Sequence, residues 1–443
     1  MKIIIIGAGP AGSDAALAAT KLGHEVILFT PQDLGGVCLN EGCIPTKTLL
    51  EDALHLTHAK EHLPHLVSLD ASASIMLHKD RIISEIKTSL LSQLLAAKVT
   101  VISSRASFID NTQIQDDSGH VYTADKIIIA TGARPHIPPL PYPHPEEFLT
   151  SQSILSKVYT QPQHFCVLGA GVIGLELSSY LKMMGHHVVI LETAPRILMS
   201  APKELATSLH RDFNQNGIDI KVNESVQRIE KIDANYHVVS QTTDALYDQI
   251  LVATGRKPNL ESLHLSNTSI VYTDKGIQVN QNFETTVPHI YAIGDVNGGI
   301  QLAHVASDQG HQLIHYLTTN VSPKLKVIPY GVYTPLQIAW AGLTEDEAKR
   351  QNKPVNVIKT LITGLAKQKI KVNTRGYIKF IMEDHHRLLG VEILSADATE
   401  LIATCVLLIE QSIDLNQASE TIFPHPTLSE ALKLALQQVP NKD

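Results

Sequence analysis

Two cysteines, Cys38 and Cys43, are separated by four residues in the run Gly35-Gly36-Val37-Cys38-Leu39-Asn40-Glu41-Gly42-Cys43-Ile44-Pro45-Thr46-Lys47. In an ideal helix their Cα atoms would be roughly 8 to 9 Å apart, which exceeds the roughly 7 Å limit for an unstrained disulfide. A bridge between them needs a distorted turn, which Gly42 permits and Pro45 favours. The spacing therefore makes this pair a candidate redox-active disulfide.

Two simpler interpretations of the pair stay open at this point. Free cysteine is among the most buried residue types, so both thiols could belong to a core. They could also form half of a metal site, although a structural zinc needs four ligands and we predict no metal. The other two cysteines, Cys166 and Cys405, are isolated within apolar runs, and we predict that they are core residues.

Composition bounds the class of protein. The chain has 443 residues, of which 44% are hydrophobic, and this length allows three compact domains. Its net charge is -8 with no basic stripe, so we expect no nucleic-acid partner. Residues 1–7 predict a buried strand that enters a glycine turn, which leaves no room for a signal peptide.

No apolar segment approaches the roughly 20 residues that span a bilayer, so we expect no membrane partner and a cytoplasmic protein. Thiols are kept reduced in that compartment. A closely spaced cysteine pair there is more plausibly catalytic than structural.

A glycine-rich pattern occurs twice in the chain. Residues 3–6 predict a strand that leads into Gly7-Ala8-Gly9-Pro10-Ala11-Gly12, followed by a helix and a strand over residues 25–29. The same order returns around Gly169-Ala170-Gly171-Val172-Ile173-Gly174, with a strand over residues 187–191. Such glycines let the backbone approach a pyrophosphate at the start of a helix. The repeat predicts an α/β fold with two Rossmann-like units and two bound dinucleotides.

A second repeated segment comes after each unit. Ala130-Thr131-Gly132-Ala133-Arg134-Pro135 and Ala253-Thr254-Gly255-Arg256-Lys257-Pro258 each close an apolar strand, over residues 126–129 and 249–252. We interpret both as turns that leave a nucleotide-binding unit.

The ends of the second strands differ between the copies. Glu192 can bind ribose hydroxyls in the second copy, whereas its counterpart in the first copy is Thr30. No arginine directly follows Glu192, so the second site favours NAD over NADP, although Arg196 is close by.

These features together resemble the pyridine nucleotide-disulfide oxidoreductase family of flavoproteins, and within it the dihydrolipoamide dehydrogenases most closely. The resemblance runs from Lys2 to about Ala435. Its most specific motifs are the cysteine run and Phe423-Pro424-His425-Pro426-Thr427-Leu428-Ser429-Glu430. The segment 286–296 resembles the second FAD motif of the family, and Leu302-Ala303-His304 resembles the stretch after it.

The resemblance implies a role for each motif. Cys38 would exchange with the substrate sulfur, and Cys43 would be the charge-transfer thiol beside the flavin. His425, oriented by Glu430, would be the base and would reach the cysteine pair of the other subunit in a homodimer. Lys47 and Glu176 would lie near the flavin and could form an ion pair.

The resemblance also assigns the cofactor contacts. FAD would contact Gly7, Gly9, Gly12, Lys47, Ala106, Thr131, Gly132, Asp295 and Ala303. NAD would contact Gly169, Gly171, Gly174, Glu176, Glu192 and Gly255.

We predict three domains. An FAD domain spans residues 1–146 and 265–325, an NAD domain spans residues 147–264, and an α+β dimerisation domain spans residues 326–443. The implied activity is NAD-dependent oxidation of dihydrolipoamide, on the lipoyl group of a 2-oxoacid dehydrogenase complex or a glycine cleavage carrier.

Two alternatives are a reductase of another small disulfide and a regulatory flavoprotein of the same fold. The last five residues lack the cysteines of mercuric and large thioredoxin reductases. Three departures from the family pattern are Val37, Gln337 and the dipeptide Phe423-Pro424 before the histidine.

Overall fold

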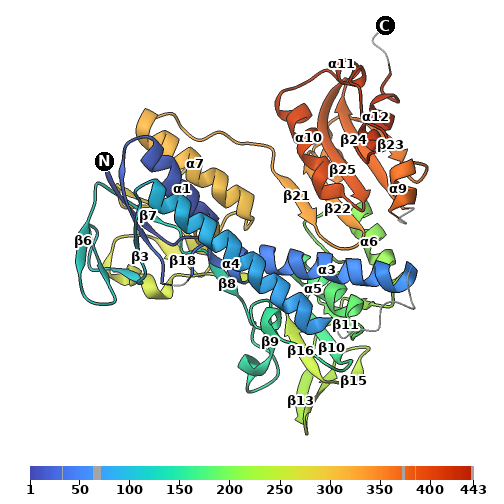
Figure 1. Ribbon diagram of the computed structural model, residues 1–443, viewed down its shortest axis with the longest axis horizontal. Coiled ribbons are helices and arrows are strands. Elements are labelled where there is room, and N and C mark those ends of the chain that lie inside the picture. The colour runs from blue at the N-terminus through green and yellow to red at the C-terminus, as the bar shows by residue number, and fades with distance from the viewer. Residues whose placement is uncertain (32, 63–70, 372–374, 385, 441–443) are drawn as a thin grey trace.

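The computed structural model describes residues 1–31, 33–62, 71–371, 375–384 and 386–440. Residues 441–443 of the cysteine-free tail thus lie outside the described residues. The described residues form two five-stranded parallel sheets and one five-stranded antiparallel sheet, each covered by helices, together with four smaller antiparallel sheets (Figure 1). Within the described ranges, no helix has the length and apolar character that crossing a membrane would require.

The first sheet contains the first glycine motif. Its parallel strands have the order β20-β7-β1-β2-β3. The elements are β1 (Lys2–Ile6), α1 (Pro10–Lys21), β2 (Glu25–Phe29), β3 (Thr100–Ile102), β7 (Lys126–Ile129) and β20 (Ile290–Ala292). Because β20 pairs with β7, the chain returns to this sheet after the second nucleotide unit.

Helices and two small antiparallel sheets, β4-β5-β6 and β18-β19, complete this first unit. Helix α7 packs along α1, and α4 lies against α3 (Figure 1). The bounds are α2 (Gly36–Asn40), α3 (Cys43–His62), α4 (Ser72–Ala96), α7 (Ala303–Thr319), β4 (Ala106–Phe108), β5 (Gln113–Asp116), β6 (Val121–Thr123), β18 (Tyr272–Thr273) and β19 (Gly276–Ile277).

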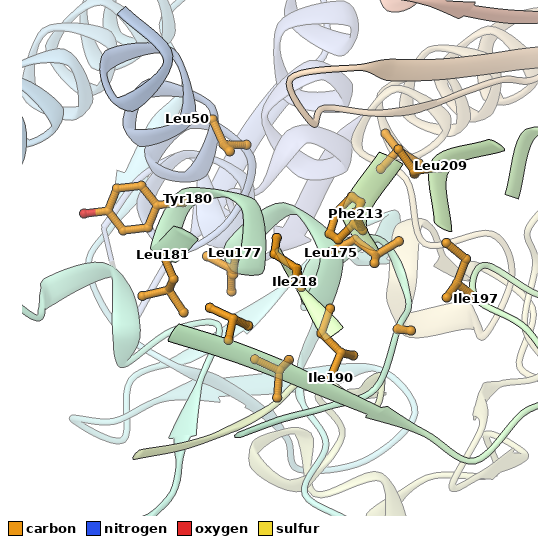
Figure 2. Packing of buried hydrophobic residues seen from close by; sticks show 14 of the residues in the cluster. Leu50, Leu175, Leu177, Tyr180, Leu181, Ile190, Ile197, Leu209, Phe213 and Ile218 are labelled. Carbon is orange, nitrogen blue, oxygen red and sulfur yellow. The ribbon is translucent and has the colours of Figure 1, made fainter. Parts of the chain in front are cut away.

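The second sheet repeats the plan with the order β12-β11-β10-β16-β9. Its elements are β9 (Leu149–Thr150), β10 (His164–Leu168), α5 (Val172–Met183), β11 (His187–Glu192), α6 (Lys203–Gln215), β12 (Asp219–Val222) and β16 (Gln249–Val252). A three-stranded antiparallel sheet lies beside it, made of β13 (Arg228–Ile232), β14 (Asn235–Val239) and β15 (Asp244–Tyr247). In Figure 2, Leu177 and Leu181 of α5 and Phe213 of α6 pack toward Ile190 of β11.

The third sheet is antiparallel, with the order β21-β22-β25-β24-β23. Its strands are β21 (Pro329–Val332), β22 (Gln337–Gly342), β23 (Asn356–Leu361), β24 (Tyr377–Glu383) and β25 (Arg387–Ser395). The associated helices are α8 (Glu345–Arg350), α9 (Ala366–Ile370), α10 (Ala398–Glu410), α11 (Leu415–Ser419) and α12 (Glu430–Leu436). Cys405 in α10 and Cys166 in β10 are buried, which confirms their prediction as core residues.

The chain passes twice between the first two units, through β8 (Ala133–Pro135) and β17 (Arg256–Pro258). These strands pair with each other in antiparallel fashion. The two connections therefore form one ribbon. The predicted domain limits at residues 146, 265 and 325 stay predictions.

Candidate functional site

A single cavity of about 1910 Å³ reaches from the first glycine motif to the second. Most predicted site residues line this cavity: Gly7, Gly9, Cys38, Cys43, Lys47, Ala106, Thr131, Gly132, Gly169, Gly171, Glu176, Glu192, Gly255, Asp295 and Ala303. Its size and its two glycine-lined ends suit two dinucleotides that meet at the cysteine pair.

The two glycine turns share the same packing. Gly7 and Gly169 have φ angles of 112° and 106°, in the region that favours glycine. A Cβ atom on Gly12 would lie 1.8 Å from the carbonyl oxygen of Gly7, and one on Gly174 would lie 2.1 Å from that of Gly169. Gly12 and Gly174 thus allow each helix to pack closely on the glycine turn before it. Neither residue is among those that line the cavity.

The second glycines, Gly9 and Gly171, leave open space toward the cavity. A Cβ atom on Gly171 would meet nothing within 4 Å, and one on Gly9 would come no nearer than 3.9 Å to the Cα atom of Gly36. Helices α1 and α5 begin directly after these residues. Their free N–H groups suit a pyrophosphate.

The ribose ends of the two units differ as the sequence predicts. The Glu192 carboxylate accepts hydrogen bonds from the N–H groups of Ala170 and Ala194, each at 2.7 Å. It therefore lies against the second glycine turn. Thr30 lines the same cavity at the end of β2 and is 5% exposed.

Arg196 is held by the backbone. Its guanidinium donates to four carbonyl oxygens, those of Ile197, Leu198, Met199 and Ala201, at 2.7 to 3.2 Å. These bonds occupy most of the donors that a 2′-phosphate would need.

The cysteine run forms two helices rather than one. Helix α2 ends at Asn40 and α3 begins at Cys43, so the break at Glu41 and Gly42 supplies the distorted turn that a bridge requires. Both cysteines are half-buried free thiols in this structure.

The two thiols shift each other's pKa in opposite directions. The hydrogen bond that Cys38 donates lowers the pKa of Cys43 to about 7, helped by the charge of Lys47 and opposed by burial. The same hydrogen bond and burial raise the pKa of Cys38 well above its usual range. Cys43 is thus the thiol of the pair that ionises first, and Cys38 is the one that keeps its proton longer.

An ion pair joins the two nucleotide units beside the cysteines. Lys47 Nζ lies 2.5 Å from Glu176 Oε2, which confirms the predicted pairing. Burial alone would lower the pKa of Lys47, but the Glu176 carboxylate outweighs it and the pKa is raised. Tyr333 completes this group, because its backbone N–H donates to Glu176 Oε1 at 2.9 Å and its ring lies 4.7 Å from Lys47 Nζ.

Asp295, Ala303 and Ala106 line the part of the cavity that belongs to the first unit. Helix α7 begins at Ala303, and β4 begins at Ala106. Burial raises the pKa of Asp295, and Arg256, 4.0 Å away, opposes this shift. A buried carboxylate of this kind needs hydrogen-bond donors, which a ligand with hydroxyl groups supplies.

Each of the two repeated turns is hydrogen-bonded to the segment that follows the other turn. The Thr131 hydroxyl donates to the Asn259 carbonyl at 2.8 Å, and the Thr254 hydroxyl donates to the His136 carbonyl at 3.0 Å. The sequence shows the repeat but gives no sign of this exchange.

His425 and Glu430 lie outside the cavity of their own chain. His425 Nδ1 lies 3.0 and 3.2 Å from the two Glu430 carboxylate oxygens, and Glu430 is the first residue of α12. The hydrogen bond with His425, together with the Thr427 N–H, lowers the pKa of Glu430. The His425 side chain is 69% exposed, so it is available to a second copy of the chain.

Sequence reasoning missed the aromatic wall of the cavity. Tyr330 and Trp340 stack with ring centroids 5.0 Å apart, and both line the cavity. The period-two alternation of β21 and β22 is the signal that could have found them, because it places both on one face.

Two nucleotide-binding units on either side of a dithiol define a two-nucleotide redox protein of the disulfide oxidoreductase type. The comparisons agree. Residues 1–310 match the family model described as pyridine nucleotide-disulphide oxidoreductase, and residues 328–436 match its dimerisation domain. The chain belongs to the pyridine nucleotide-disulphide oxidoreductase family, as predicted, and the cofactors of this family are FAD and NAD(H). The dimerisation domain supports the predicted homodimer.

Individual relatives point to two kinds of enzyme. The chain is 32% identical to the dihydrolipoyl dehydrogenase of Bacillus subtilis, over 98% of both chains. It matches the structure of the HOCl-induced flavoprotein disulfide reductase RclA from Escherichia coli with a TM-score of 0.89 and 28% identity, over 99% of this chain and 100% of that one. LpdA from Mycobacterium tuberculosis, at 24% identity and a TM-score of 0.90 over all of both chains, supports the fold.

Proposed function

We propose that this enzyme oxidises dihydrolipoamide with NAD, on the lipoyl group of a 2-oxoacid dehydrogenase complex or a glycine cleavage carrier. The observation that carries the proposal is that Cys38 and Cys43 lie in one cavity with both glycine motifs, next to the Lys47–Glu176 ion pair. Similarity to dihydrolipoyl dehydrogenases over nearly the full chain supports the choice of substrate.

Each residue has a defined part in this proposal. When bound, FAD accepts two electrons from a dithiol and passes them to a nicotinamide. Cys38 exchanges with the substrate sulfur, and Cys43 is held as the thiolate by Lys47 and by the Cys38 thiol. His425 of a partner subunit takes the proton of the incoming thiol, and Glu430 stabilises the imidazolium that results.

The second unit favours NAD over NADP. The Glu192 carboxylate lies where ribose hydroxyls are bound in this fold, and it would repel a 2′-phosphate. Arg196 uses its donors on four carbonyl groups, so it offers little compensation.

A second candidate function is reduction of another disulfide, as the name of RclA indicates for that protein. Its structural similarity over the whole chain favours this alternative. The Phe423-Pro424 dipeptide before His425 is the feature of this chain that could alter the substrate entrance.

Turnover of the purified holoenzyme distinguishes the two. We expect faster turnover with dihydrolipoamide and NAD than with glutathione disulfide and NADPH, and the reverse order would reject the lipoamide assignment. Cys38→Ser should reduce disulfide turnover by at least about a thousandfold, since the nucleophile is lost, while the variant keeps its flavin. Cys405→Ser, at a buried cysteine in α10, is the matched control and should keep full turnover.

A further inference from the structure

A row of five side chains crosses the third sheet, one from each strand. The strand register pairs Tyr330 with Trp340, Trp340 with Glu392, Glu392 with Lys379, and Lys379 with Lys359. Directly paired residues lie on the same face of a sheet. The row therefore runs from β21 to β23 along a single face.

One end of the row belongs to the cavity. The stacked rings of Tyr330 and Trp340 differ by 4° in orientation and form part of the cavity wall. Trp340 is 5% exposed and is the only tryptophan of the chain.

The residues at the other end of the row form ion pairs with the NAD unit. Lys379 Nζ lies 3.0 Å from the carboxylate of Glu204, 2.6 Å from that of Glu345 and 3.4 Å from that of Glu392. Lys359 forms a second ion pair with Glu204. Glu204 belongs to α6, so one carboxylate of the NAD unit meets two lysines of the third sheet.

The rest of α6 strengthens this contact. Asp212, two turns further along the helix on the same face, forms an ion pair with Arg375 at 3.1 Å. Leu209 and Phe213 of α6 belong to one apolar cluster with Trp340 and Tyr377 of the third sheet. The helix is thus fixed to the sheet by a shared core and by ion pairs at both of its ends.

Burial makes the Lys379 contacts specific. Lys379 is 4% exposed and Glu392 is 2% exposed. Water therefore cannot solvate either charge if its ion-pair partner is removed. The ion pairs therefore favour one position of α6 over neighbouring ones.

We propose that Glu204 is a positioning residue for the nicotinamide cofactor. Through Lys379, Glu392 and Trp340, Glu204 sets the orientation of the NAD unit relative to the cavity wall. The proposal rests on the assignment of NAD to the second unit. It does not depend on which disulfide the enzyme uses. Hydride transfer is sensitive to such orientation, because displacements near 1 Å already cost rate.

The test replaces Glu204 by Gln in the holoenzyme. Reduction of the bound flavin by NADH, monitored after rapid mixing, should show a fall on the order of tenfold in its limiting rate and a rise in the half-saturating NADH concentration. Reduction of the same flavin by excess dithiothreitol, a small dithiol, should proceed at the wild-type rate, because the cysteine pair is untouched. Trp340 fluorescence should lose part of its response to NAD⁺ titration.

Two further variants separate positioning from general destabilisation. Glu204→Asp keeps the charge and should recover part of the NADH affinity. Glu230→Gln removes a carboxylate from an exposed ion pair with Arg228 within the same unit, and it should leave every measurement unchanged.

Equal loss in both half-reactions, or a lower melting temperature with unchanged NADH dependence, would overturn the proposal. Failure of the lipoamide assignment would appear instead as slow turnover of dihydrolipoamide by the wild-type enzyme, with its NADH half-reaction intact.

Discussion

The first and second nucleotide units share a backbone plan but differ in the side chains that meet the ligand. In both, the third glycine lets the helix pack onto the carbonyl oxygen of the first glycine, as seen for Gly12 and Gly174. At the ribose end, however, Glu192 of the second unit corresponds to Thr30 of the first. The comparison teaches that the packing glycines are common to both turns, whereas the strand end is where the two units place different side chains in the cavity.

The units also differ in the charged side chain that each places beside the dithiol. The cysteine-bearing helices α2 and α3, which come directly after β2 of the first unit, supply Lys47, and α5 of the second unit supplies Glu176. Each unit thus contributes one charge to the group around the dithiol. This difference is open to direct tests.

The largest effect should come from breaking the shared packing. Gly12→Ala and Gly174→Ala would each place a methyl group within 2.1 Å of a backbone carbonyl oxygen. We expect each to lower the free energy of unfolding by about 3 kcal/mol, measured by chemical denaturation of the holoenzyme. Equal losses would support the shared plan, and a loss at only one site would break it.

The second glycines provide the control for this experiment. Gly171→Ala introduces a methyl group with nothing within 4 Å, so the protein should keep its stability. It should weaken NAD binding, because the methyl group points into space that a ligand needs. A stability loss equal to that of Gly174→Ala would contradict the packing explanation.

A smaller effect is expected when the second unit is made to resemble the first. Glu192→Thr should raise the Kd for NAD about tenfold, since hydrogen bonds to a charged group contribute roughly 1.5 to 3 kcal/mol. Isothermal titration of the holoenzyme measures this change. Thr30→Ser keeps the hydroxyl of the first unit and should leave NAD binding as it is. An unchanged Kd for Glu192→Thr would show that the carboxylate does not contact the ribose.

The smallest effect concerns the charges that the two units place near Cys43. Lys47 lowers the pKa of Cys43 and Glu176 raises it. Lys47→Met should therefore raise this pKa from about 7, and Glu176→Gln should lower it, each by roughly one unit or less.

Alkylation of Cys43 in the reduced enzyme, followed by mass spectrometry across pH, measures this shift. The rate should rise as pH increases through the pKa, because the thiolate is the reactive form. Shifts in the same direction for both variants would contradict opposite roles for the two charges.

Local patterns predicted the elements well. The strand expected over residues 25–29 is β2 (Glu25–Phe29), and the strand expected over residues 187–191 is β11 (His187–Glu192). The spacing of apolar residues within a short stretch of sequence is enough to predict such an element.

The Lys47–Glu176 pair was predicted across 129 residues only because the chain resembles a known family. The contacts of Glu204 with Lys359 and Lys379 were not predicted. These contacts depend on the strand register between β23 and β24 and on the position at which α6 packs against the third sheet. No local pattern in a single sequence specifies either of these.

The paired strands β8 and β17 have a consequence for how such a chain could be assembled. Because they run side by side in opposite directions, the NAD unit leaves and rejoins its host at one place. A unit whose two ends meet can be added to an existing domain without disturbing the order of strands in the host sheet. The second unit is thus an insertion into the first, and the matching glycine turns of the two units are what duplication of one unit would leave.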